Sequence, residues 1–275
     1  MSKFRPSFNS IYVIPDIHGH YDQLKLICKR ILPLRKSDGG KDTLIFLGDY
    51  IDRGPNSPEV LDYLIEIKER YDEQIIFLRG NHEQMLLTSL GALPENPDPF
   101  RNSSYSMWVE TGGDSTLKSY AARQGIVDNP LTLPRRILKD LIPKNHIEFM
   151  LSTALFHETD SYIFVHAGCD PGIPLSEQDG DFLVWDRSLF LRAKNILIKN
   201  LDWTWEKPII TGHNHVGPFI TEKFMMLDCS GAKKLIITEL NSMEAYEARL
   251  NKKRLVKTVL QETKVKKPVF RRVDA

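Results

Sequence analysis

Short apolar runs alternate with amphipathic stretches in the first third of the sequence. Residues 11–14, 43–47 and 75–78 are apolar runs rich in β-branched and aromatic side chains, which predict buried strands. Residues 21–32 repeat apolar side chains at helical spacing, and Pro58 opens a second amphipathic helix. Three successive strand-then-helix units predict right-handed crossovers and a mainly parallel sheet.

The pattern changes after residue 91. A loop rich in proline, at residues 93–99, precedes helical segments near 114–122 and 134–151, so residues 91–160 predict a helical insert. Strand patterns return at 162–165, 209–210, 224–227, 235–240 and 255–260 with little helix between them, which predicts a second, mixed or antiparallel sheet. We expect residues 1–275 to form one domain with a basic tail at 262–275.

Polar motifs follow the first three predicted strands, and two more occur later. The motifs are Asp16-Ile17-His18, Gly48 to Gly54, Gly80 to Glu83, His166 to Gly168 and Gly212 to His215. In open α/β sheets, ligands bind beyond the carboxyl ends of the strands. The carboxylates, imidazoles and one amide in these motifs suit two neighbouring metal ions, which promote hydrolysis of phosphate esters.

The donor types favour particular metals. Asp49 is central in the motif order and can bridge two ions, whereas Asp16 and His18 can face one ion from a single turn. Asn81 adds a neutral oxygen. Mixed oxygen and nitrogen donors suit Mn²⁺, Fe or Zn²⁺ better than Ca²⁺ or Mg²⁺.

The strings DIHG, GDYIDRG, GNHE, HAG and GH resemble those of the calcineurin-like metallophosphoesterases. More narrowly, they resemble the phosphoprotein phosphatase family in its bacterial serine/threonine form, to which symmetrical diadenosine tetraphosphatases are related. The resemblance implies an α/β fold, a four-layer α/β/β/α sandwich with the dimetal site at the sheet edge.

The resemblance also implies roles for individual residues. One ion would be bound by Asp16, His18 and Asp49, and the other by Asp49, Asn81, His166 and His213. A hydroxide that bridges the ions would attack phosphorus in line, without a phosphoenzyme.

Four further residues complete the implied apparatus. His82 matches the general acid, and Asp52 matches the carboxylate that orients it; we expect Asp52 to raise the pKa of His82. Arg53 matches a phosphate-binding arginine, and Arg187 is our choice for the second. His215 departs from the family pattern and is either a seventh metal ligand or a polar neighbour of the site.

The motifs leave the substrate open. A phosphatase acting on phosphoserine and phosphothreonine in proteins is the leading hypothesis, and a symmetrical dinucleoside-tetraphosphate hydrolase is the alternative, since both reactions present the same phosphoryl group. A non-catalytic binding scaffold on the same fold is a remote alternative, because every expected ligand is present.

Composition adds weaker constraints. The net charge of +1 gives no indication of a nucleic-acid or membrane partner, and no apolar run approaches the roughly 20 residues that span a bilayer. Cys28, Cys169 and Cys229 are far apart and odd in number, so neither a disulfide framework nor a cysteine zinc site is expected. Without a signal-peptide pattern, a cytoplasmic location is the default. The oligomeric state is left open.

Overall fold

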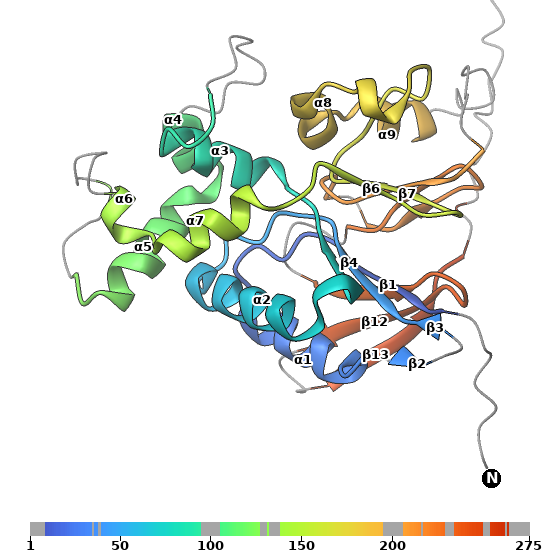
Figure 1. The fold of residues 1–275 in the computed structure, drawn as a ribbon, viewed down its shortest axis with the longest axis horizontal. Helices are drawn as coiled ribbons and strands as arrows, with labels where there is room; N and C mark the ends of the chain where they lie inside the picture. Colours follow the sequence, from blue (N-terminus) through green and yellow to red (C-terminus); the bar gives the residue numbers. More distant parts are fainter. Residues whose placement is uncertain are drawn as a thin grey trace, which may run out of the picture.

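The computed structural model describes most of the 275-residue chain (Figure 1). The described residues are 9–34, 36–37, 40–94, 105–126, 131, 138–194, 206–215, 217–228, 234–249, 254–261 and 263. The predicted basic tail therefore lies almost entirely outside the described residues.

The first sheet has six strands in the order β13-β12-β11-β1-β4-β5. Its parallel half consists of β1 (Ile11–Ile14), β4 (Thr43–Phe46) and β5 (Ile75–Phe77). Its antiparallel half consists of β11 (Ile236–Glu239), β12 (Glu244–Arg249) and β13 (Arg254–Val259). Helices α1 (Tyr21–Ile31) and α2 (Ser57–Tyr71) cover one face of this sheet (Figure 1).

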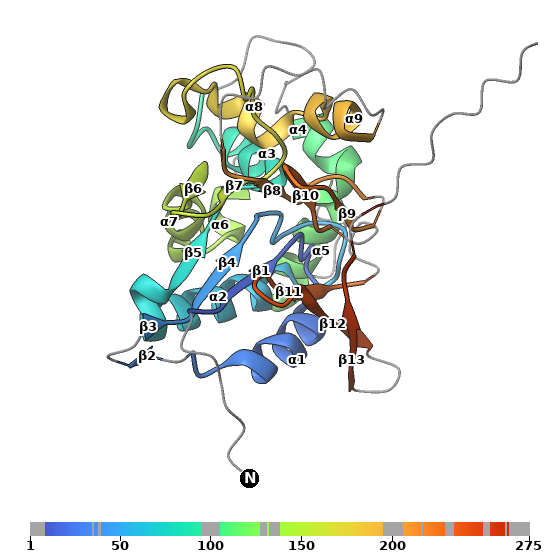
Figure 2. The same cartoon turned by 90° about the vertical axis from the view of Figure 1, so that its right-hand side faces the viewer.

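The second sheet has five strands in the order β6-β7-β8-β10-β9. Its strands are β6 (Phe156–Glu158), β7 (Ile163–Val165), β8 (Ile209–Thr211), β9 (Phe219–Ile220) and β10 (Phe224–Met226). Helices α8 (Gly180–Trp185) and α9 (Ser188–Lys194) lie over its outer face (Figures 1 and 2). A small hairpin, β2 (Lys36–Ser37) and β3 (Gly40–Lys41), stands apart from both sheets.

Three apolar cores separate four layers. One core joins α1 and α2 to the first sheet, a second joins α8 and α9 to the second sheet, and the third lies between the two sheets. The middle core includes Val13 and Ile45 from the first sheet and Phe164 and Ile210 from the second. This arrangement confirms the predicted four-layer α/β sandwich.

Several helices lie between β5 and β6. They are α3 (Asn81–Ser89), α4 (Tyr105–Trp108), α5 (Asp114–Arg123), α6 (Leu138–Leu141) and α7 (Lys144–Leu151). The turn Val109–Gly113, which is kinked at Gly112, joins α4 to α5. Short 3-10 turns occur at Asp72–Gln74 and Leu175–Glu177. Figure 1 shows α3 to α7 gathered beside one end of the two sheets.

The structure corrects three expectations about the secondary structure. Strands β11 and β13, predicted for the second sheet, extend the first one, which is therefore parallel only in half. Helices α8 and α9 occupy a stretch expected to hold little helix. Strand β12 was missed because its sequence, EAYEAR, is rich in charged side chains; only Ala245 and Ala248 of the strand are buried.

The topology gathers six strand ends at one edge. Strands β1, β4 and β5 run parallel in the first sheet, and β7, β8 and β10 run parallel in the second. A polar residue follows each of these strands by one to four positions: Asp16, Asp49, Asn81, His166, His213 and Asp228. Among the described residues, every helix is too short or too polar to span a bilayer.

Candidate active site

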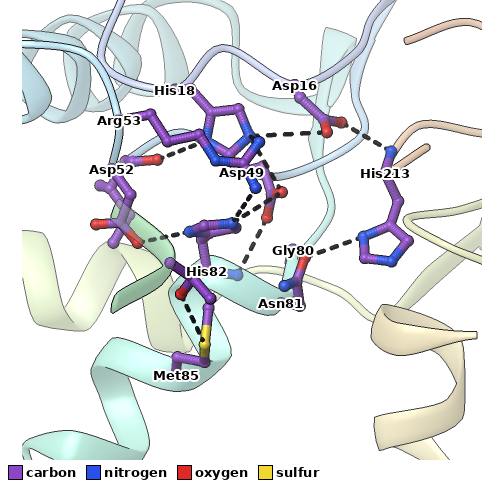
Figure 3. Close-up of polar contacts among 12 residues, drawn as sticks. Asp16, His18, Asp49, Asp52, Arg53, Gly80, Asn81, His82, Met85 and His213 are labelled. Atoms are coloured by element: carbon purple, nitrogen blue, oxygen red, sulfur yellow. Dashed lines mark hydrogen bonds and ion pairs between the residues drawn. The ribbon is translucent and has the colours of Figure 1, made fainter. Parts of the chain in front are cut away.

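Asp49 lies at the centre of the polar residues at this edge (Figure 3). Its Oδ2 is 3.5 Å from Nε2 of His18 and 3.9 Å from Nε2 of His82. Its Oδ1 is 3.5 Å from Nε2 of His166 and accepts a hydrogen bond of 3.1 Å from the backbone N–H of His82. The Asp49 carboxylate therefore faces two groups of imidazoles. His18 and His82 follow strands of the first sheet, and His166 follows a strand of the second.

Two carboxylate oxygens in this region are buried without hydrogen-bond donors. Oδ2 of Asp16 and Oδ2 of Asp49 have no hydrogen-bond partner among the described residues. Burial, and then the neighbouring Asp228 and Asp49, raise the pKa of Asp16 well above its usual range; burial and Glu83 do the same to the pKa of Asp49. Buried carboxylates whose pKa is raised in this way are stabilised as anions by a cation bound beside them.

Three side-chain atoms from three elements converge next to Asp49. Nε2 of His166 and Nδ1 of His213 each lie 3.1 Å from Oδ1 of Asn81. Nδ1 of His166 donates to the Leu47 carbonyl, so its Nε2 lone pair points at the Asn81 oxygen. Burial lowers the pKa of His166 to about 3, which keeps the ring neutral. Lone pairs of a neutral imidazole and an amide oxygen directed at one point are a donor set for a metal ion.

His18 is oriented in the same way. Its Nδ1 donates a 2.9 Å bond to the Ile51 carbonyl, which leaves Nε2 with a lone pair facing Asp49 and Asp16. Burial and the adjacent His82 lower the pKa of His18 well below its ordinary value. The neutral ring is therefore presented as a ligand with its tautomer fixed by the backbone.

The backbone of the site is strained. Positive φ angles occur at His18 (47°), Asp49 (53°), Asp52 (74°), Arg53 (66°) and His213 (66°). Residues other than glycine rarely adopt this conformation, which persists only where the surroundings enforce it.

Glu83, which the sequence analysis did not single out, supplies part of this enforcement. Its Oε2 accepts the N–H groups of Asp49 (2.8 Å) and Gly80 (3.0 Å), and its Oε1 accepts those of Tyr50 (2.8 Å) and Ile51 (3.3 Å). Burial raises the pKa of this fully buried carboxyl to about 7. Glu83 thus ties the loop after β4 to the start of α3, where it stands three residues beyond the Gly80 cap.

His82 and Asp52 form a buried dyad. Nδ1 of His82 donates a 2.6 Å hydrogen bond to Oδ2 of Asp52, and Nε2 of His82 faces the centre of the site (Figure 3). The pKa of His82 is lowered by burial and by the Arg53 guanidinium, so the expectation of a raised pKa is wrong for this arrangement. Burial raises the pKa of Asp52 to about 7, although Thr116 and Trp108 oppose that shift by hydrogen bonding.

Two arginines border the site. Arg53 donates to Nε2 of His18 (2.9 Å), His82 (3.0 Å) and His215 (2.6 Å). Arg187 follows α8 and donates from Nε to Nε2 of His213 at 3.1 Å. The two guanidinium groups therefore approach the site from opposite sheets.

His215 is paired with a residue that the sequence analysis missed. Its Nδ1 lies 2.6 Å from Oδ2 of Asp228, which is 1% exposed, and its Nε2 points at Arg53. Asp228 follows β10 as Asp16 follows β1, so the strand-end pattern could have identified it. Asp16, His215 and Asp228 are close enough to share one cation.

The structure brings all the predicted site residues into one contact network. They are Asp16, His18, Asp49, Asp52, Arg53, Asn81, His82, His166, Arg187, His213 and His215. The donor set fits a pair of divalent ions, because bare buried carboxylate oxygens and neutral nitrogen lone pairs converge on both sides of Asp49.

The comparisons with known proteins agree with this geometry. The family described as calcineurin-like phosphoesterase matches residues 10–217, which is most of the chain. The chain belongs to the calcineurin-like phosphoesterase family. Its predicted class, a hydrolase of phosphoric esters, is thereby confirmed, and the groups of histidines and carboxylates agree with the dimetal centre of the family.

Two curated relatives are similar to short stretches of this phosphoesterase. Serine/threonine-protein phosphatase SIT4 of Candida albicans is 36% identical over 89 residues, which are 32% of this chain and 28% of that protein. The PP2A-like phosphatase PPG1 of the same organism is 38% identical over 81 residues, 29% of this chain and 18% of that protein. The chain thus matches less than a third of the length of either relative.

Solved structures share the fold at low identity. A proposed diadenosine tetraphosphatase has a TM-score of 0.53 at 15% identity, with 91% of this chain and 93% of that chain covered. The cold-active protein-tyrosine phosphatase of a Shewanella species has a TM-score of 0.54 at 18% identity, with 94% and 83% covered. These likenesses concern the fold alone.

Proposed function

We propose that this phosphoesterase uses two divalent ions to hydrolyse phosphoserine and phosphothreonine esters in proteins. The observation that carries the proposal is the position of Asp49, whose two oxygens face separate imidazole groups from the two sheets. A carboxylate shared in this way is suited to bridge two ions a few ångströms apart.

The proposed ligands divide around Asp49. Asp16, His18 and Asp49 would hold the first ion, and Asp49, Asn81, His166 and His213 the second; His215 would add a nitrogen to the first. The mixed oxygen and nitrogen donors favour Mn²⁺, with Fe and Zn²⁺ as the other candidates. When bound, the pair would neutralise phosphoryl oxygens and lower the pKa of a water molecule for in-line attack.

Arg53 and Arg187 would bind the remaining phosphoryl oxygens. Arg53 reaches three imidazole nitrogens at once, so its guanidinium lies where a phosphate must enter. Arginine can donate two parallel hydrogen bonds to phosphate, which fixes orientation as well as charge. The phosphorus would thereby be held with its leaving oxygen turned toward His82.

His82 would protonate that leaving oxygen. Its Nδ1–H is engaged by Asp52, so the proton to be transferred would have to bind Nε2, the atom that faces the centre of the site and that accepts from Arg53 in this structure. A bound phosphate would draw Arg53 toward itself and add negative charge beside the ring. Both changes oppose the effect of Arg53 on the pKa of His82 and favour the protonated ring.

A symmetrical dinucleoside-tetraphosphate hydrolase is the alternative function. The fold neighbour described as a proposed diadenosine tetraphosphatase supports it, and the serine/threonine phosphatase relatives support the protein substrate. A cytoplasmic location is part of the same proposal, and it rests on the sequence alone.

Three substrates compared side by side test the proposal. The protein is stripped with a chelator, verified metal-free by elemental analysis, and reloaded with Mn²⁺, Zn²⁺ or Fe²⁺. We expect a phosphothreonine peptide to be hydrolysed faster than a phosphotyrosine peptide or diadenosine tetraphosphate, and only by the reloaded protein. Full activity in the metal-free protein contradicts the dimetal mechanism, and a higher kcat/KM for diadenosine tetraphosphate selects the alternative.

A further inference from the structure

We infer that residues Trp108–Thr116 are a positioning element of the active site, which holds Asp52 and Arg53 in place from the helical region. The inference rests on the proposed roles of His82, Asp52 and Arg53. It assigns a role to a segment that includes the end of α4, the kinked turn Val109–Gly113 and the start of α5.

The Asp52 carboxylate receives a hydrogen bond from each end of this segment. Nε1 of Trp108 donates to Oδ2 at 2.9 Å, and Oγ1 of Thr116 donates to Oδ1 at 2.6 Å. Together with Nδ1 of His82 at 2.6 Å, these donors fix the carboxylate in one orientation. All four side chains are at most 1% exposed, so water does not replace a lost donor.

The segment also holds the backbone of the same two residues. The N–H of Arg53 donates to the carbonyl of Gly112 at 3.0 Å, and the N–H of Asp52 donates to Oγ1 of Thr116 at 2.9 Å. Asp52 and Arg53 both have positive φ, a conformation that needs such support. Asp52 is proposed to orient the general acid, and Arg53 is proposed to bind phosphate. Both residues are therefore held by the same segment.

The local sequence is adapted to this close approach. Gly112 has a φ of 119°, and a Cβ at this position would lie 2.7 Å from Cγ of Arg53. A Cβ on Gly113 would overlap the indole of Trp108. Gly112 allows the kinked turn between α4 and α5 to lie directly on Arg53, and Gly113 leaves room beside it for the Trp108 indole.

The first test removes the donors to Asp52. Trp108→Phe removes the N–H and retains an aromatic ring, and Thr116→Val removes the hydroxyl at nearly constant volume. If Asp52 then holds His82 less firmly, we expect kcat for an alkyl phosphate to fall about 10-fold and kcat for an activated aryl phosphate to fall less, since an aryl leaving group needs less protonation. Thr116→Ser should restore the alkyl rate, and elemental analysis should still find two ions.

The second test displaces Arg53. Gly112→Ala introduces a methyl group against Cγ of Arg53 and strains the backbone at positive φ. We expect KM for both esters and the Kd for inorganic phosphate, measured by calorimetry on the metal-loaded protein, to rise roughly 10-fold. The ratio of alkyl to aryl kcat should change less than in Trp108→Phe, because the donors from Trp108 and Thr116 to the Asp52 carboxylate are retained.

Tyr120→Phe is the matched control. Tyr120 lies in α5, as Thr116 does, but its hydroxyl is paired with Nδ1 of His146 in α7 at 2.6 Å and not with the Asp52 carboxylate. It should lower stability and leave the alkyl-to-aryl ratio unchanged. If Trp108→Phe behaves like Tyr120→Phe while His82→Asn changes the ratio, the segment is only structural and the inference is overturned. If His82→Asn itself leaves the ratio unchanged, it is the proposed acid that fails.

Discussion

Substitution of Glu83 by glutamine should destabilise the active-site loops and weaken metal binding together. Each carboxylate oxygen of Glu83 accepts two backbone N–H groups, from Asp49 and Gly80 or from Tyr50 and Ile51. A glutamine offers one oxygen and one NH₂ group, so in either orientation it turns a donor toward two buried donors. These two N–H groups then lack an acceptor.

The expected magnitude follows from that count. A buried backbone donor without a partner costs about 1–3 kcal/mol, so two donors cost roughly 2–6 kcal/mol of the free energy of unfolding. Because one of the N–H groups belongs to Asp49 or its neighbour, the left-handed backbone there relaxes and the carboxylate leaves its central position. Mn²⁺ affinity should therefore fall by about 10-fold or more.

Two measurements on the same preparation check this reasoning. Urea denaturation of the metal-free protein, followed by tryptophan fluorescence, gives the change in the free energy of unfolding. Calorimetric titration with Mn²⁺ gives the affinity. Glu148→Gln is the control, because Glu148 is exposed on α7 and pairs only with Lys144 among the described residues. A loss below about 1 kcal/mol with unchanged metal affinity would refute the role of Glu83.

Three further substitutions separate the proposed roles. Asp49→Asn should lose both ions by elemental analysis, whereas Asp16→Asn should lose one; equal losses would contradict a bridge. His82→Asn should keep two ions yet slow an alkyl ester about 10²–10⁴-fold, more than an aryl ester, with unaltered rates for His157→Asn as control. His215→Ala should lower the affinity for one of the two ions in a metal titration. If both bind with unchanged affinity, His215 is a neighbour of the site and not a ligand.

The sequence was most informative where a strand ends on a polar motif. An apolar run followed by Asp16 or Asp49 predicts both a buried strand and the edge at which its carboxylate lies, because parallel strands end together. The α/β fold, and the gathering of these polar residues at one edge of the sheets, could be predicted for that reason.

Other features depend on contacts that no short pattern encodes. Glu83 stands in a recognised motif, but its four backbone partners become visible only when the loop after β4 folds over the start of α3. Trp108 and Thr116 lie 56 and 64 positions from Asp52, and nothing around them specifies that pairing. Strand β12 packs on β11 with a charged outer face, so its alternation is weak.

The proposed metal ligands come from both sheets, and an apolar core lies between these sheets. Asp16, Asp49 and Asn81 follow strands of the first sheet, whereas His166 and His213 follow strands of the second. The thickness of this core, formed by side chains such as Leu47 and Phe164, therefore sets the distance between the two groups of ligands that would bind the second ion. Close-packed cores resist compression and expansion. The apolar core of this protein thus sets the spacing of its proposed metal ligands, and a change in the volume of that core would change the spacing.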